Sequence, residues 1–319
     1  MERLKRNLVL ALALGAAVYL ILAVLSNLGE LAAALHNFDY ALIPAILGLV
    51  ALSYVGRFFR WTYYLRVLKV SVPTGINAAI FTSGLSMTIS PGKLGEVLKS
   101  VFVRNVTGAP IARTAPAVFA ERATDGTGMV LWGFLGAFTL DLPPWTMLIF
   151  LALAAFGIAV LRSERLSLAA ERILSELPLV NRLAPHLSDF HGASNELLWT
   201  RPLLVGTAIS FFSWGLECAG VYLCAVGLGV DRPFLLIVFV FALSSLLGVL
   251  SMLPGGIGAV EAGLYGQFVA LANLSTGLAG ALTLVIRLAT LWFATLLGIC
   301  GLLLVRRLLG DAPLEPHEQ

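Results

Sequence analysis

The sequence predicts an all-α polytopic integral membrane protein, and three observations lead to this fold class. First, 59% of the 319 residues are hydrophobic and only 12% are charged, about half the charged fraction of a soluble domain. Second, several apolar runs reach the ~20 residues that are needed to span a bilayer. Third, Lys and Arg cluster in alternate loops, which is the pattern of a chain that crosses a membrane repeatedly.

The apolar runs place six full spans along the chain. We expect them at about 8–28, 40–60, 114–139, 144–161, 203–227 and 278–305. The first run follows a basic start but is longer than the apolar core of a signal peptide, so we interpret it as a retained helix.

The basic residues give the orientation. Eighteen of the 21 Lys and Arg residues fall in the segments 1–7, 57–69, 93–113, 162–201 and 306–307. The positive-inside rule assigns these segments to the cytoplasm. Both termini are therefore expected inside, in a multi-pass protein of the cell (plasma or inner) membrane.

The whole chain, 1–319, is expected to form one membrane domain with two halves. The first half covers about 1–161 and the second about 202–308, followed by a short polar tail at 309–319. Between the halves, 162–201 mixes apolar and charged residues at helical spacing, which predicts an amphipathic linker on the inner face.

Two hydrophobic segments, 74–105 and 233–274, are broken by the same pattern of Pro, Gly and a following Glu. The break residues are Pro91, Gly92, Gly95, Pro254, Gly255, Gly256 and Gly258. The charge pattern returns each segment to the side from which it starts. We therefore predict two re-entrant helical hairpins that enter from opposite faces and form an inverted-topology repeat.

The spacing after the breaks supports a repeat. Arg122 follows Pro91 by 31 residues, and Arg287 follows Pro254 by 33 residues. The Glu residues after the two breaks differ by the same two positions, so one short insertion aligns both features. A shared site requires that the tips of the two hairpins meet.

Ionisable residues inside membrane spans are costly, so each is a candidate for function. The predicted cations for a lipid head group are Arg57, Arg60, Lys93, Arg122 and Arg287. The predicted groups for charge balance or a proton relay are Glu96, Glu121, Asp125, Glu217 and Glu261. Two hairpin helices starting near Lys93 and Ile257 would aim their N-termini at the same region and favour an anion there.

Structural roles remain open for several of these residues. Arg57 and Arg60 could anchor a helix at the interface, and Glu96 and Glu261 could cap the hairpin helices. The Glu121–Asp125 cluster could neutralise itself, although one carboxylate would then need a partner elsewhere. For Arg287 the candidate partners are Glu217, Glu261 or a bound anion.

The sequence contains no catalytic motif and no metal-ligand spacing. We therefore expect no enzyme activity, no cofactor, no metal and no nucleic-acid partner.

The order of these motifs resembles the lysylphosphatidylglycerol synthase transmembrane-region family, over nearly the whole chain. The resemblance is carried by Arg57-x-x-Arg60-Trp61, Pro91-Gly92-Lys93-x-Gly95-Glu96, Glu121-Arg122-x-x-Asp125 and Leu253-Pro254-Gly255-Gly256-Ile257-Gly258-x-x-Glu261. It implies lipid handling, most directly a flippase that moves a lipid between leaflets. It does not imply lysyl transfer, which belongs to a separate soluble domain.

The expected partners are membrane lipids with an anionic or phosphate-bearing head group, with an aminoacylated, isoprenoid or glycan-bearing lipid included. An enzyme of lipid or glycan synthesis and a second copy of the chain are further possible partners. Two alternatives to transport stay open: a membrane scaffold for such an enzyme, or a lipid-modifying enzyme with its site near Lys93, Glu96 and Arg60.

Overall fold

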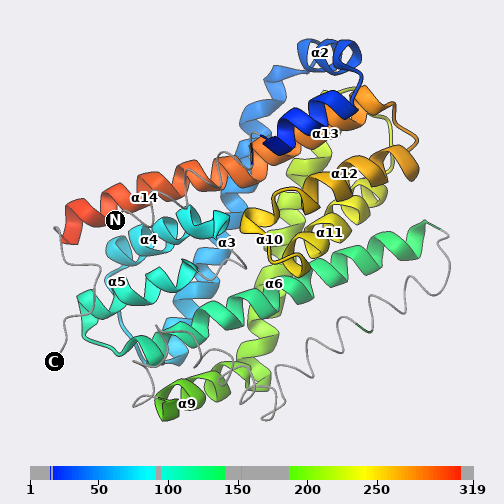
Figure 1. The fold of residues 1–319 in the computed structure, drawn as a ribbon. Helices are drawn as coiled ribbons and strands as arrows, with labels where there is room; N and C mark the ends of the chain where they lie inside the picture. Colours follow the sequence, from blue (N-terminus) through cyan, green and yellow to red (C-terminus); the bar gives the residue numbers. More distant parts are fainter. Residues whose placement is uncertain (1–14, 16, 91–94, 141–151, 153–186, 310–319) are drawn as a thin grey trace.

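The computed structural model describes residues 15, 17–90, 95–140, 152 and 187–309, and in these residues it consists of helices joined by short connections, without β-strands (Figure 1). This confirms the predicted all-α class. The predicted span at 144–161, most of the linker, the polar tail and the residues Pro91, Gly92 and Lys93 lie outside the described residues.

The first described helix is Ala17–Leu25, and eleven further described α-helices follow it. These are α2 (Leu28–His36), α3 (Ile43–Val67), α4 (Thr74–Gly84), α5 (Leu98–Thr107), α6 (Ile111–Thr139), α9 (Leu187–Leu198), α10 (Thr200–Gly227), α11 (Phe234–Leu250), α12 (Ala259–Ala270), α13 (Thr276–Arg287) and α14 (Phe293–Leu309). Short 3₁₀ turns lie at Tyr40–Leu42, Leu85–Ile89 (η2) and Pro254–Gly256 (η5), and a π-helical turn at Leu288–Trp292 joins α13 to α14.

Three stretches among the described residues are long and apolar enough to cross a bilayer: Tyr40–Val67, Thr200–Gly227 and Thr276–Leu309. They match three of the predicted spans. The predicted span at 8–28 does not continue as a straight helix beyond Leu25, because the helix Ala17–Leu25 meets α2 at an angle of 104°. Helix α6 has 29 residues but carries the charged cluster in its middle. The total of six spans remains a prediction.

Helices α3 and α10 pack against each other through the middle of the molecule (Figure 1). Small residues allow this close approach, because a Cβ atom on Gly56 would collide with Ser213 and one on Gly206 would collide with Tyr64. Helices α6 and α11 pack beside α10, and α9 packs on α6 with Ala193 and Leu197 fully buried. The described end of the linker is therefore docked on the first half.

The same turn follows α3 and α10. Lys69 and Gly229 have positive φ angles of 58° and 69°, at corresponding positions just beyond the two helix ends. Left-handed residues at this position commonly terminate helices. Pro73 and Pro233 then precede α4 and α11 at equal distances from these turns. The two halves thus begin their hairpin segments in the same way.

Both hairpin segments fold as a helix, a break and a second helix. In the second, Gly255, Gly256 and Gly258 have φ angles of 62°, 63° and 95°, which a residue with a Cβ rarely adopts. In the first, the Gly95 amide donates to Ser90 Oγ at 2.9 Å. The glycines of the second break therefore separate α11 from α12 where the sequence predicts.

The tips of the two hairpins meet. Ile89 of the first hairpin packs with Ile257 of the second and with Leu291 of the π turn. A Cβ atom on Gly255 would lie 3.6 Å from the Cα atom of Ile89. The condition for a shared site is therefore fulfilled.

The first hairpin also lies directly on α14. A Cβ atom on Gly298 would collide with the backbone of Ser86, and one on Gly301 would lie 2.6 Å from the Ser83 amide nitrogen. Two glycines one turn apart let the backbones touch. This contact fixes the first hairpin against the second half of the chain.

Candidate functional site: a charged cavity between the hairpin tips

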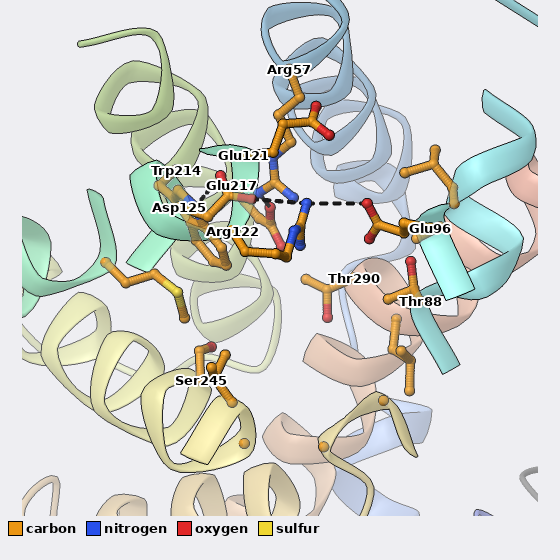
Figure 2. A pocket seen from close by; sticks show the side chains of 18 of the residues that line it. Arg57, Thr88, Glu96, Glu121, Arg122, Asp125, Trp214, Glu217, Ser245 and Thr290 are labelled. Atoms are coloured by element: carbon orange, nitrogen blue, oxygen red, sulfur yellow. Dashed lines mark hydrogen bonds and ion pairs between the residues drawn. The ribbon is translucent and has the colours of Figure 1, made fainter. Parts of the chain in front are cut away.

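A cavity of about 190 Å³ lies where the two hairpin tips, α3, α6 and α10 meet (Figure 2). Most of the predicted site residues converge on it. The lining includes Arg57, Arg60, Glu96, Glu121, Arg122, Asp125, Glu217, Gly255, Gly256 and Arg287. Glu261 lies next to Arg287, behind the lining. Residues from distant parts of the sequence thus form one site.

Arg57 joins α3 to α10 and is buried. Its guanidinium forms an ion pair with Glu217. The same group lies over the Trp214 ring, 4.6 Å from its centroid, and 5.4 Å from the centroid of Tyr54. Interface anchoring is therefore the wrong interpretation of Arg57, because its partners are in the interior. Glu217, in turn, pairs with Arg57 and not with Arg287.

Arg60 is fully buried and joins α3 to α6. Its Nη1 atom lies 2.7 Å from Asp125 Oδ1 and donates to Thr124 Oγ1 at 3.1 Å. Asp125 Oδ1 also accepts from Ser210 Oγ at 2.9 Å and from Trp214 Nε1 at 3.3 Å, both on α10. An interface anchor is again the wrong interpretation, since this ion pair holds three helices together.

Lys99 is a buried member of the site that sequence analysis missed. Its Nζ atom lies 2.5 Å from Glu121 Oε2 and 3.5 Å from Glu96 Oε2, and it sits 4.5 Å from the centroid of the Trp61 ring. The sequence interpretation counted Lys99 with the inner-face charges. One signal in the sequence could have indicated the role of Lys99: it lies three residues after Glu96, and residues three apart share a helix face.

The structure provides a cation for Glu121, the carboxylate that was left over in the charged cluster on α6. Sequence analysis noted that Glu121, Arg122 and Asp125 leave one carboxylate over, and Lys99 of α5 supplies the missing cation. The pair between Arg122 and Asp125, three residues apart on α6, is present at 3.1 Å. The cluster is thus neutralised by a second helix.

Arg122 differs from the other cations because its side chain is 28% exposed, whereas the remaining ion-paired side chains that line the described cavity are at most 10% exposed. Its Nη2 atom lies 3.3 Å from Glu96 Oε2 and 3.1 Å from Asp125 Oδ2. Figure 2 shows the guanidinium reaching from α6 across the cavity towards Glu96. Its buried Nε–H has no hydrogen-bond acceptor among the described residues.

Arg287 forms a buried ion pair with Glu261, which was one of the three partners that the sequence analysis considered. We call this the closed pair, because both of its side chains are buried. Arg287 Nε lies 2.7 Å from Glu261 Oε1, and its Nη2 donates to the Gly255 carbonyl at 3.0 Å. Glu261 Oε2 also accepts from the Gly258 amide at 2.7 Å, so its carboxylate caps the start of α12. The cap interpretation of Glu261 is therefore confirmed. The amide of Gly258, the residue just before α12, is thus already satisfied by protein.

Three residues with hydroxyl groups also line the cavity. Thr88, Ser245 and Thr290 lie there (Figure 2), and Thr290 belongs to the π-helical turn, a feature often found at functional sites. Sequence analysis did not find these residues, because single Ser and Thr residues in apolar helices give no distinct signal. The described residues contain no His, Cys, Asp and Glu group suited to a metal.

The fold and the cavity define a helical membrane protein whose charged side chains converge on an internal site. The chain belongs to the family described as the lysylphosphatidylglycerol synthase TM region, whose model matches residues 8–298. This confirms the resemblance that its motifs indicated.

Among its relatives is a UPF0104 membrane protein of Methanothermobacter thermautotrophicus, 27% identical over 305 residues that cover 86% of this chain and 88% of the relative. A UPF0104 membrane protein of Pyrococcus horikoshii is 26% identical over 280 residues, 78% and 83% of the two chains. A third, from Methanocaldococcus jannaschii, is 28% identical over 234 residues, 69% and 94% of the two chains.

Proposed function

We propose that this protein is a flippase that moves a phospholipid, or another phosphate-bearing lipid, between the two leaflets. The head group would enter the charged cavity while the acyl chains stay in the bilayer. The observation that carries the proposal is Arg122, a partly exposed arginine at a cavity that both hairpin tips contact.

The energetic argument begins with the cost of moving a charged head group through hydrocarbon. Such a group needs partners that replace its hydration shell. Arginine supplies charge-assisted hydrogen bonds that match the geometry of a phosphate. Arg122 is the most exposed of the paired cations around the cavity, and its nearest carboxylate, at 3.1 Å, is farther away than the nearest carboxylates of Arg60, at 2.7 Å, and Lys99, at 2.5 Å. It is therefore the cation best placed to exchange its partners for a ligand.

The size of the cavity fits a head group and not a whole lipid. Its volume of about 190 Å³ is below the ~300–1,000 Å³ of pockets that enclose a drug-sized ligand. Two acyl chains need far more room. A flippase solves this problem by leaving the chains in lipid and moving only the polar group through protein.

The arrangement of the halves supports an alternating-access mechanism. Arg57 and Glu217 follow Tyr54 and Trp214 by three residues each, and Arg57 contacts the other three side chains between α3 and α10. Corresponding positions of two repeats face each other in this way at a twofold axis. With the predicted cytoplasmic termini, the hairpins would enter from opposite faces, and rocking of the halves would expose the cavity to each side in turn.

The proposal excludes lysyl transfer and treats the protein as a transporter and not as an enzyme. A neighbouring enzyme of lipid or glycan synthesis would supply or consume the lipid, and a second copy of the chain would be a compatible partner. A scaffold role accounts less well for the cavity, because buried charges are costly and a scaffold gains nothing from them.

Leaflet exchange in proteoliposomes tests the proposal. Acyl-labelled phospholipids are quenched from the outside, and the labelled fraction that becomes accessible with time gives the rate. We expect the wild-type protein to exchange at least one phosphate-bearing lipid, and Arg122→Ala to lower that rate by about tenfold or more. Arg113→Ala is the matched control: Arg113 is on the same helix but pairs with Glu196, outside the cavity. Equal rates for both variants, or no wild-type exchange above empty liposomes, would refute the proposal.

A further inference from the structure

We infer that the opening between α6 and the end of α11 is a lateral portal, through which the acyl chains of the bound lipid extend from the cavity into the bilayer. Val249, Met252 and Leu253 contact the chains there. The inference rests on the proposed function, because it takes a lipid head group as the ligand of the cavity. It adds the side on which the cavity meets the bilayer and the residues that bind the chains.

Exposed side chains occur on one side of the cavity. Among the lining residues that the structure describes, Val249, Met252 and Leu253 are exposed, and the others are buried or partly buried. All three lie between the last turns of α11 and the break at Pro254. The cavity therefore opens to its surroundings beside the tip of the second hairpin.

The face of α11 that lines the cavity becomes more exposed along the helix. Phe241, Ser245 and Val249 follow one another at intervals of four residues, which places them on one face. Phe241 is buried, Ser245 is partly buried (Figure 2), and Val249 is exposed. The surrounding helices thus cover the middle of this face and leave its end uncovered.

The facing side of α6 shows the same change. A Cβ atom on Gly136 would lie only 2.7 Å from the Cβ atom of Phe239 on α11, and Met129, two turns closer to the charged cluster, is buried. A Cβ atom on Gly126 would have no described atom within 4 Å, and Arg122 lies one turn further along. The two helices therefore touch at Gly136 and leave a gap beside the cavity.

The described elements pack closely on other sides of the cavity. A Cβ atom on Gly56 of α3 would collide with Ser213 of α10, and one on Gly128 of α6 would lie 3.1 Å from the Ser210 hydroxyl of α10. The hairpin tips meet where Gly255 approaches Ile89. These contacts leave no passage for a chain, in contrast to the gap at the end of α11.

The surface at the gap is apolar. Leu247 and Leu250, next to the three exposed lining residues, are exposed as well. A contiguous apolar surface beside a polar cavity is typical of a site that contacts a ligand or a membrane. Acyl chains are covalently joined to the head group, so they must leave the cavity next to it, and an apolar exit keeps them away from water. The unbranched side chain of Met252 adapts to chains of different shape.

A matched pair of variants tests the portal. Val249→Trp places an indole in the gap, and Leu52→Trp places one on α3, outside the cavity lining. The two native side chains are 52% and 50% exposed, so neither change has to displace the core. In proteoliposomes with acyl-labelled phosphatidylethanolamine or phosphatidylglycerol, we expect Val249→Trp to lower the exchange of both lipids by about tenfold or more. Leu52→Trp should keep the wild-type rates.

Crosslinking shows whether the chains in the gap belong to the lipid that Arg122 binds. A phospholipid with a photoreactive diazirine on one acyl chain is activated in proteoliposomes, and the modified peptides are identified by mass spectrometry. We expect adducts at residues 249–253 that fall by about fivefold or more in Arg122→Ala. Adducts near Leu52, where α3 contacts bulk lipid, should not change.

Wild-type exchange by Val249→Trp, or adducts at residues 249–253 that Arg122→Ala leaves unchanged, would overturn the portal while leaving a flippase in place. A disulfide between two copies of Val249→Cys would also overturn it, because the exposed surface would then be an interface. This variant needs a Cys300→Ser background, since Cys300 is exposed. If Val249→Trp does not fold, the crosslinking decides. Absence of exchange by the wild-type protein contradicts the proposed function itself.

Discussion

The two hairpins carry the same break and the same following glutamate, but they use them differently. Glu261 of the second hairpin caps its own helix and closes on Arg287. Glu96 of the first hairpin instead joins a cluster with Lys99 and Arg122, and this cluster includes the partly exposed arginine of the cavity. A repeated motif therefore marks the location of the site in both halves, while the chemistry is concentrated in one of them.

The two-residue difference in spacing explains the divergence. Glu261 is the third residue of α12 and lies three residues after its cap, Gly258, the position from which a carboxylate reaches back to the cap amide. Glu96 lies two residues before α5 begins at Leu98. It is too early to cap that helix in the same way, so its side chain is available to cations on neighbouring elements.

The largest expected effect concerns the first hairpin. Lys99→Met removes a buried cation from two carboxylates, and the free energy of unfolding should fall by roughly 3–5 kcal/mol. Denaturant unfolding in detergent micelles measures this value. The double variant Lys99→Met/Glu121→Gln removes both members of the closer pair and should regain a large part of the loss. If Lys99→Met alone is as stable as the wild type, Lys99 is not the partner of Glu121.

The closed pair of the second hairpin should give a smaller loss. In Arg287→Met, Glu261 keeps the Gly258 amide as a donor, so we expect a loss of about 3 kcal/mol, at the lower end of the range for broken buried pairs. The ratio of phosphatidylethanolamine to phosphatidylglycerol exchange should stay at the wild-type value. A changed lipid preference would mean that the second hairpin also selects the head group, against the contrast drawn above.

A steric variant tests how firmly the first hairpin is fixed. Gly298→Ala places a methyl group against the backbone of Ser86, and overpacking of this kind typically costs about 1–3 kcal/mol. Gly48→Ala is the matched control, since no atom lies within 4 Å of its Cβ position on α3. Equal stability of the two variants would show that α14 and the first hairpin are not in backbone contact.

The smallest effect is expected at Arg113, whose ion pair with Glu196 is partly exposed at 2.9 Å. Exposed pairs contribute about 0–1 kcal/mol, so Arg113→Ala should alter the unfolding free energy by no more than that. A loss comparable with that of Lys99→Met would indicate that docking of α9 stabilises the whole fold.

Local spacing in the sequence was enough to predict features that depend on local structure. The Pro-Gly breaks located both hairpins, and the matched distances to Arg122 and Arg287 led to the prediction that the tips share a site. Glu261 was named both as a cap and as a partner of Arg287, and it is both.

Tertiary register could not be predicted in the same way. Arg57 meets Glu217 because α3 packs against α10, and no spacing within either helix encodes that contact. Lys99 was assigned to the inner face because charge counts along the chain do not distinguish a loop lysine from one buried against Trp61 and Glu121. The hydroxyl groups of the cavity gave no signal for a similar reason.

The central claim is that a lipid head group occupies the cavity beside Arg122. An experimental density map of the protein in nanodiscs of phosphatidylethanolamine and phosphatidylglycerol tests it most directly. We predict a phosphate within hydrogen-bond distance of Arg122, with the acyl chains extending into the bilayer. A cavity that contains only water in such a map, with head groups confined to the two membrane surfaces, would contradict the account.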